Sequence, residues 1–180
     1  MSAGALDANI RQWAAARRLP QSHLERWLAL ACADRRALLE SAEAVRMRTG
    51  QFVAAFELIA EIAVREREPI AAIIARAEIR RILDGAGSAP EKAVRFLGAL
   101  RAMRYPRLKK MGDRLAAAIA ALGLPRGIAV ALPHDLASDE LRIEIVAHGG
   151  AELESLAVAL TEKLDGLKRI AEMVGGADEI

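Results

Sequence analysis

Apolar residues recur through the first hundred positions at the spacing of α-helices. Leu6, Ile10 and Trp13 follow one another at intervals of four and three residues, and Phe52 and Phe56 continue this spacing later in the chain. Side chains at such intervals line one face of a helix and leave the remaining faces polar. The pattern therefore predicts a set of amphipathic helices, six of them before residue 105, that bury one side against each other.

Capping residues, glycines and prolines indicate where these helices begin and end. The Ser-x-x-Glu capping box that begins a helix occurs at 22–25 and at 88–91, and Asp34 is a candidate N-cap. The segment 84–90 is rich in glycine, and the segment 105–106 ends in proline, so both interrupt the helical pattern. These signals separate the predicted helices from one another.

The period of the pattern changes after residue 122. A seventh helix is expected over about 107–122. Apolar residues then alternate with small or charged residues over 128–132 and 141–145, which is the spacing of half-buried β-strands. The connection of 133–140 is short enough to keep the two strands antiparallel. A long final helix is expected over about 151–173.

Together these elements predict a mainly α-helical fold. An N-terminal helical bundle (1–104) is followed by a small α-β-β-α module (105–180) with a two-stranded antiparallel sheet. Two strands alone are marginal in water, and the final helix carries an apolar heptad seam. We therefore expect the module to form a homodimer; the alternative is that the seam packs on the N-terminal helices of the same chain. The leucines expected at the dimer interface are Leu153, Leu160, Leu164 and Leu167.

The distribution of charge suggests a partner. The chain is 53% apolar and 28% charged, which is typical of a folded globular protein. Its net charge of +2 combines a net charge of +6 over 84–127 with one of −7 over 128–180. A localised basic segment can contact the phosphates of DNA; the alternatives are a solvated face or a surface that meets the acidic C-terminal half. The candidate DNA-binding residues are Arg95, Arg101, Arg104, Arg107, Lys109, Lys110 and Arg114.

Residues 52–83 are a second, weaker candidate for DNA binding. They could form a helix-turn-helix whose second helix carries Arg76, Arg80 and Arg81. That helix lacks the combination of Asn, Gln and Arg side chains that reads base edges in the major groove. The pattern alone is therefore a weak indication of sequence-specific DNA binding.

The sequence offers few side chains for catalysis. The three histidines are scattered, and the motifs HExxH, CxxC and GxSxG are absent. His134 and Asp135 with Asp139 and Glu140 could bind a metal ion in one loop, but such a cluster is far more often a polar turn. Cys32 lies in an apolar run and is expected to be a small core residue. We expect no enzymatic activity, no cofactor and no metal.

Signals for export or membrane insertion are also missing from the sequence. The most apolar stretch, 115–134, contains Gly123 and Pro125, which would break a membrane helix where no water could satisfy the backbone. The single cysteine excludes an internal disulfide framework and is typical of a reducing compartment. We expect a cytoplasmic protein that does not contact a membrane.

The order of segments between about residues 35 and 165 resembles the C-terminal region of ParB-like proteins, the partition-type proteins of bacterial chromosomes and plasmids. The stretches that carry the resemblance are Glu-Ile-Ala-Val-Arg-Glu at 61–66, Ile-Arg-Arg-Ile-Leu at 79–83, Leu-Arg-Ala-Met-Arg-Tyr-Pro-Arg-Leu at 100–108, Leu-Gly-Leu-Pro-Arg-Gly at 122–127 and Asp-Glu-Leu-Arg-Ile-Glu at 139–144. The α-β-β-α order also resembles the dimerisation domain at the end of those proteins.

The sequence departs from that family in two ways. The N-terminal nucleotide-binding domain, with its arginine motifs, has no counterpart here, and a clear central helix-turn-helix is missing or reduced. The resemblance therefore implies dimerisation and DNA contact but not CTP hydrolysis. The first hypothesis is a non-enzymatic, ParB-related accessory protein that dimerises and binds DNA. The second is an adaptor or regulatory subunit that pairs with a full-length partition-type protein without touching DNA.

Overall fold

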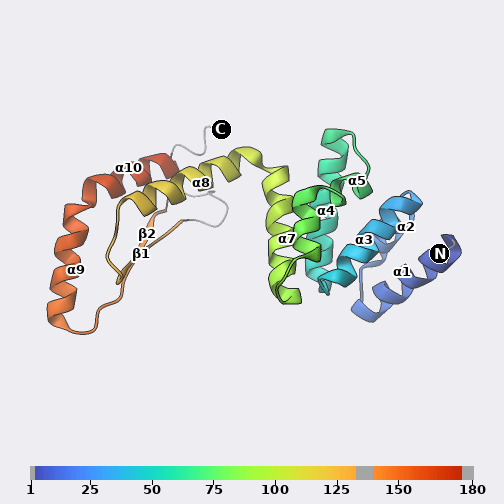
Figure 1. Ribbon diagram of the computed structural model, residues 1–180, viewed down its shortest axis with the longest axis horizontal. Helices are drawn as coiled ribbons and strands as arrows, with labels where there is room; N and C mark the ends of the chain where they lie inside the picture. Colours follow the sequence, from blue (N-terminus) through green and yellow to red (C-terminus); the bar gives the residue numbers. More distant parts are fainter. Residues whose placement is uncertain (1–2, 133–139, 176–180) are drawn as a thin grey trace. The chain divides into compact units, whose positions relative to one another are not determined.

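The chain folds into two compact units, Met1–Arg104 (unit 1) and Tyr105–Ile180 (unit 2), which are described separately (Figure 1). The computed structural model describes residues 3–132 and 140–175. Most of these residues are helical, and a two-stranded antiparallel sheet lies late in the chain between helices. The predicted fold class, mainly α with a small two-stranded sheet, is confirmed.

Unit 1 is built from seven helices in the part of the chain that the structure describes. They are α1 (Ala3–Arg17), α2 (Gln21–Leu28), α3 (Cys32–Ala44), α4 (Thr49–Glu66), α5 (Ile70–Ile74), α6 (Ala77–Asp84) and α7 (Ala89–Arg104). The longest helix, α4, packs along α7, and α5 packs on α3 and α4. Because α4 also contacts α1, through the rings of Phe52 and Trp13, it lies at the centre of the core.

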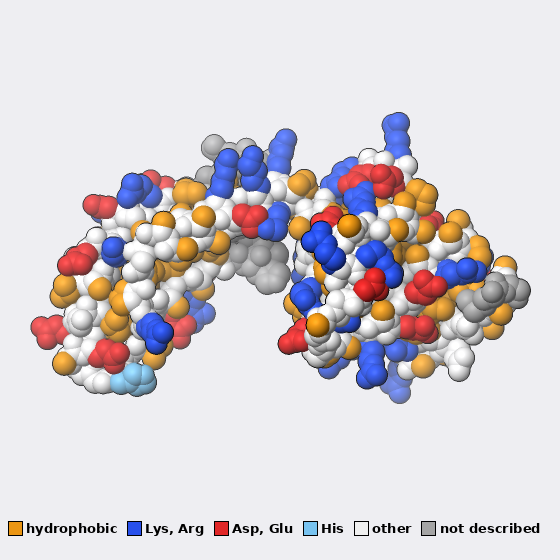
Figure 2. All heavy atoms as spheres, in the orientation of Figure 1, with side chains coloured by type: hydrophobic (Ala, Val, Ile, Leu, Met, Phe, Trp, Pro, Cys, Tyr) orange, Lys and Arg blue, Asp and Glu red, His pale blue; other side chains and the backbone are white. Residues whose placement is uncertain are grey.

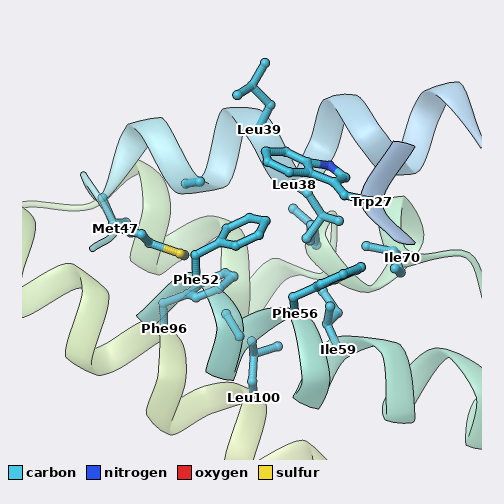
Figure 3. Packing of buried hydrophobic residues seen from close by; sticks show 14 of the residues in the cluster. Trp27, Leu38, Leu39, Met47, Phe52, Phe56, Ile59, Ile70, Phe96 and Leu100 are labelled. Carbon is cyan, nitrogen blue, oxygen red and sulfur yellow. The ribbon is translucent and has the colours of Figure 1, made fainter. Parts of the chain in front are cut away.

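Aromatic rings form one end of that core (Figure 3). The ring centroids of Trp27 and Phe52 are 4.6 Å apart, and those of Phe52 and Phe56 are 5.9 Å apart. Trp13 meets the Trp27 ring edge to face, at a centroid distance of 5.6 Å. Figure 3 shows Phe96 of α7 reaching toward the same region from the opposite side. Offset and edge-to-face geometries of this kind add to the stabilisation from burial alone, so unit 1 has a well-filled core of its own.

Two predicted helix starts are wrong, and one is confirmed. The helix α2 begins at Gln21, and Ser22 does not cap it. Pro20 occupies the N-cap position instead, and its carbonyl oxygen accepts hydrogen bonds from the N–H groups of His23 and Leu24. The helix α3 begins at Cys32, and Asp34 instead accepts a hydrogen bond from the backbone N–H of Ala71 in α5. At the start of α7, the predicted capping box is present: the Glu91 carboxylate accepts from the Ser88 N–H at 2.8 Å.

Unit 2 contains α8 (Pro106–Ala121), β1 (Ile128–Ala131), β2 (Arg142–Ile145), α9 (Gly150–Glu162) and α10 (Leu164–Gly175). The two strands pair antiparallel with Ile128 opposite Ile145 and Val130 opposite Ile143. Directly opposed residues project from the same face of a sheet. One face of this small sheet is therefore apolar, whereas the other carries alanines opposite Arg142 and Glu144.

The single final helix expected over 151–173 is wrong, because the chain ends one helix at Glu162 and begins another at Leu164. The break accompanies the close packing of α10 on the end of α8. A Cβ atom added at Gly166 would lie 2.3 Å from Leu122 Cδ2, so a larger residue here would require the Leu122 side chain to shift. The helix changes direction at Lys163, and Ile170 and Val174 then pack with Leu115 of α8.

Candidate functional site

The helix α9 buries little of its surface within unit 2. Leu156 is its one buried residue, although the helix also carries several other apolar side chains. The side chains of Leu153 and of Leu164, at the start of α10, are 51% and 45% exposed. A helix of this composition normally buries a stripe against a neighbour. The α9 face therefore lies open within its own unit.

The sheet is open in a similar way. All four residues of β2 are exposed. Ile143 and Ile145 are each 37% exposed, although they lie opposite Val130 and Ile128 on the apolar face of the sheet. Val146, which directly follows the strand, is also exposed. The sequence predicted an apolar face that needs cover, and the unit leaves this face partly uncovered.

The four leucines predicted at a dimer interface divide into two groups. Leu153 and Leu164 are exposed, and Leu160 is half-buried. Leu167 is only 3% exposed and follows Gly166 where α10 packs on α8. The side chain of Leu167 is therefore covered within its own unit and offers little surface to a second copy, because the chain turns at Lys163 and α10 packs on α8.

The basic residues of α7 are largely engaged within unit 1. Arg95 donates a hydrogen bond to the carbonyl oxygen of Ala86 at 2.7 Å, which holds the loop before the helix. Arg104 forms an ion pair with Glu61 of α4. The side chain of Arg65 donates to the carbonyl oxygens of Met103 and Arg104, at 2.7 Å each. Arg101 is exposed and belongs to the last turn of α7. These contacts reduce the positive charge available for an external partner.

The basic residues of α8 have a different arrangement. Lys109 is paired with Asp113 one turn away, at 2.6 Å from one carboxylate oxygen. Arg107, Lys110 and Arg114 are exposed and follow one another at intervals of three and four residues, so they share one face of the helix. Figure 2 shows Lys and Arg side chains projecting from the upper side of α8. We call these three residues the α8 basic stripe.

The arginines of the candidate helix-turn-helix are held by nearby acceptors. Arg76 pairs with Glu66 and Glu68, Arg80 pairs with Asp84, and Arg81 donates to the carbonyl oxygen of Ala77. Hydrogen bonds from Arg76 and Arg65 lower the pKa of the Glu66 carboxyl below its ordinary value. This ion-pair network fastens the end of α4 to the start of α6.

No side-chain cluster in the described residues has the composition of a metal site. The proposed loop residues His134, Asp135 and Asp139 lie outside the described residues, and Glu140 is exposed. Cys32 is half-buried and packs against the core of unit 1. Of the described helices, none has the length and apolarity needed to cross a membrane.

Comparison of this chain with protein family models, with curated proteins and with solved structures finds no match. The resemblance to ParB-like proteins therefore stays a prediction, and the exposed surfaces of unit 2 are the evidence on which a function can be argued.

Proposed function

We propose that this protein is a non-enzymatic, ParB-related accessory protein that forms a homodimer through unit 2 and binds duplex DNA through the α8 basic stripe. The observation that carries the proposal is the uncovered apolar surface of unit 2. Eight of the ten exposed large hydrophobic residues in the described part of the chain belong to this unit. Large exposed apolar surfaces are typical of interaction sites.

The small core of unit 2 supports dimerisation. Six of its described apolar residues are buried: Leu115, Ile128, Leu156, Leu167, Ile170 and Val174. A two-stranded sheet needs cover on its apolar face to be stable in water. Covering a half-exposed Leu or Ile contributes roughly 1 kcal/mol, so a partner that covers Leu153, Ile143 and Ile145 stabilises the unit by several times that amount.

A second copy of the chain is the partner that this surface fits best. Residues of the same apolar type lie on the open face of the sheet and on the open face of α9. In a two-fold symmetric dimer the same patch is used by both copies, so an apolar patch meets an apolar patch. The exposed leucines Leu153 and Leu164 would then cover each other or the sheet of the second copy.

The dimer is tested by the change Leu153→Asp. A carboxylate at this exposed position leaves the fold of the unit intact but places a charge in the interface, so light scattering after size-exclusion chromatography should show a monomer. The matched control is Val64→Asp, because Val64 is 80% exposed on α4 of unit 1. A monomeric wild-type protein at micromolar concentration would contradict the proposal.

The DNA contact follows from the charge and spacing of the α8 basic stripe. Three cationic side chains on one helix face can each neutralise a phosphate without reading bases. Each such contact contributes about −0.9 to the slope of log affinity against log salt. The stripe therefore predicts binding that does not depend on DNA sequence and that weakens with salt at a slope of roughly −3 per chain.

Fluorescence anisotropy with a labelled duplex, measured over a series of salt concentrations, tests this part. The variant R107Q/K110Q/R114Q should bind more weakly than the wild type, and its salt slope should be smaller by about 3. The control R11Q/R80Q/R81Q removes the same number of exposed arginine or lysine charges from unit 1 and should bind nearly as well as the wild type. Equal losses of DNA affinity in the two variants would show that the net charge of the protein, and not the stripe, governs binding.

An adaptor that pairs with a full-length partition-type protein is the second candidate function. It is favoured by the ion pair of Arg104 with Glu61, by the internal hydrogen bond of Arg95, and by the acidic residues Glu152 and Glu154 that flank Leu153 on α9. A monomer that does not bind DNA even at low salt, but that is captured by such a partner through Leu153, would support this function instead.

A further inference from the structure

Four arginines come together at one end of unit 1 from segments far apart in the sequence. Arg17 and Arg18 end and follow α1, and Arg46 and Arg48 lie in the turn between α3 and α4. Two hydrogen bonds join the segments: Arg17 Nε donates to the carbonyl oxygen of Met47 at 3.1 Å, and Thr49 Oγ1 donates to the carbonyl oxygen of Arg17. We call Arg17, Arg18, Arg46 and Arg48 the arginine patch.

Carboxylates do not neutralise this patch within the described residues. Arg18, Arg46 and Arg48 are exposed, and none of the four arginines takes part in an ion pair there. Arg17 lies over the Trp13 ring, 4.4 Å from its centroid. Figure 2 shows Lys and Arg side chains projecting from the lower edge of unit 1, where α1 ends and α4 begins. The patch therefore presents its positive charge to solvent.

Two of these arginines occupy backbone positions that do not favour arginine. Arg18 has φ 52° and Arg46 has φ 48°, in the left-handed region that follows a helix and that glycine or asparagine usually fills. A side chain with a Cβ atom costs roughly 1 kcal/mol in this region. The helix dipole offsets part of that cost, and neither exposed side chain gains from packing. The main effect of these two side chains is the charge that they place on the surface.

The composition of the surface points to a phosphate backbone as its partner. Guanidinium groups form paired hydrogen bonds with phosphate oxygens. A protein partner would normally require an apolar centre in the interface. The exposed large hydrophobic residues of unit 1, in the part that the structure describes, are Val64 and Val94, and neither belongs to the segments that form the patch. We infer that the arginine patch binds the phosphodiester backbone of nucleic acid.

The patch is separate from the basic residues at the other end of α4. It lies where α4 begins, whereas Arg65 and Arg104 lie where α4 ends, and the 18 residues of this helix span about 27 Å. The inference goes beyond the proposed function, because it does not depend on the α8 basic stripe or on dimerisation. Each surface can bind phosphates without the other.

The double variant R18G/R46G tests the inference in the full chain. Glycine accepts the left-handed backbone without strain, so the free energy of unfolding should stay unchanged or rise. Binding to a short labelled DNA duplex at low salt should weaken roughly tenfold, and the salt slope should fall by about 2. The variant R18N/R46N should behave in the same way, since asparagine also tolerates this backbone conformation.

The control R67G/R81Q removes two arginine charges elsewhere in unit 1, including one at the left-handed position that ends α4. An equal weakening of DNA binding in R18G/R46G and in this control would overturn the inference. Wild-type DNA binding by R18G/R46G would also overturn the inference. The variant R107Q/K110Q/R114Q is measured in parallel. A lack of DNA binding by the α8 basic stripe is therefore distinguished from a lack of DNA binding by the arginine patch.

Discussion

At Gly127 in unit 2, a buried side chain and a backbone carbonyl together leave no room for a side chain. A Cβ atom at this position would lie 2.7 Å from Leu156 Cδ1 and 2.8 Å from the carbonyl oxygen of Val146. The first neighbour is the one buried side chain of α9, and the second belongs to the residue after β2, whose N–H donates to Gly127 O at 2.8 Å. Glycine at position 127 therefore lets the sheet and α9 pack closely against each other.

The change Gly127→Ala should destabilise the protein by roughly 1–3 kcal/mol, because the added methyl group forces the backbone and Leu156 apart. Gly112 is the matched control: it lies inside α8, and nothing is within 4 Å of its Cβ position. Gly112→Ala should stabilise the protein by about 0.5–1 kcal/mol through helix propensity. Urea unfolding, monitored by circular dichroism, measures the free energy of unfolding of both variants. A destabilising Gly112→Ala together with a neutral Gly127→Ala would contradict the packing described here.

At the scale of elements, a network of charged side chains fastens three helices of unit 1 to each other. Glu66 at the end of α4 is paired with Arg65 and with Arg76, the residue before α6, and Arg76 also reaches Glu68. Arg65 in turn bonds to the end of α7. The side chains of Glu66 and Arg76 are each 28% exposed, so solvent screens their ion pair only partly.

This network predicts a pH-dependent contribution to stability. The pKa of Glu66 lies below its unfolded value because Arg76 and Arg65 donate hydrogen bonds to the ionised carboxylate. Such a group contributes stability above the unfolded pKa, near 4.3, and this stability is lost as the pH falls through the folded pKa. Glu66→Gln should therefore lower the free energy of unfolding by about 1 kcal/mol at pH 7, and the difference from wild type should vanish in acid.

Urea unfolding at neutral pH and at pH values below about 4 measures this difference. Glu40→Gln is the control, since Glu40 is exposed on α3 and has no ion-pair partner in the described residues. It should change stability by less than about 0.5 kcal/mol at either pH. A constant effect of Glu66→Gln at all pH values would contradict the role of the ionised carboxylate.

At the scale of the whole molecule, the two units differ sharply in how much they bury. Unit 1 contains a cluster of 24 buried apolar residues, whereas six are buried in the described part of unit 2. A unit with its own core unfolds as a cooperative body. A unit that is stabilised by a second copy instead has a stability that depends on protein concentration.

Thermal unfolding should therefore occur in two steps. Both tryptophans of the chain, Trp13 and Trp27, are buried in unit 1, so their fluorescence reports on that unit. The fluorescence transition should not depend on protein concentration, whereas a separate transition in circular dichroism should rise in temperature as the concentration increases. Leu153→Asp should remove that dependence. A single transition that both probes report at all concentrations would contradict the independence of the units.

Much of the fold could be predicted from local sequence patterns. The spacing of Leu6, Ile10 and Trp13 predicted α1, the capping box at Ser88 predicted the start of α7, and the alternation around Val130 and Ile143 predicted the antiparallel sheet. Each of these features depends on residues that are close together in the sequence, or on the regular spacing of the apolar residues that face the core. The sequence of this protein by itself therefore determined most of its helices, its two strands and the order of these elements.

Only the tertiary structure decided how side chains from distant segments meet. The final helix is divided at Lys163 and Leu167 is buried where α10 packs on α8, and Asp34 accepts a hydrogen bond from Ala71 instead of capping its own helix. The same holds for the arginine patch, which joins segments about thirty residues apart. Helix periodicity is set by neighbours within a few residues, whereas the position of one helix against another depends on which side chains leave room for close approach.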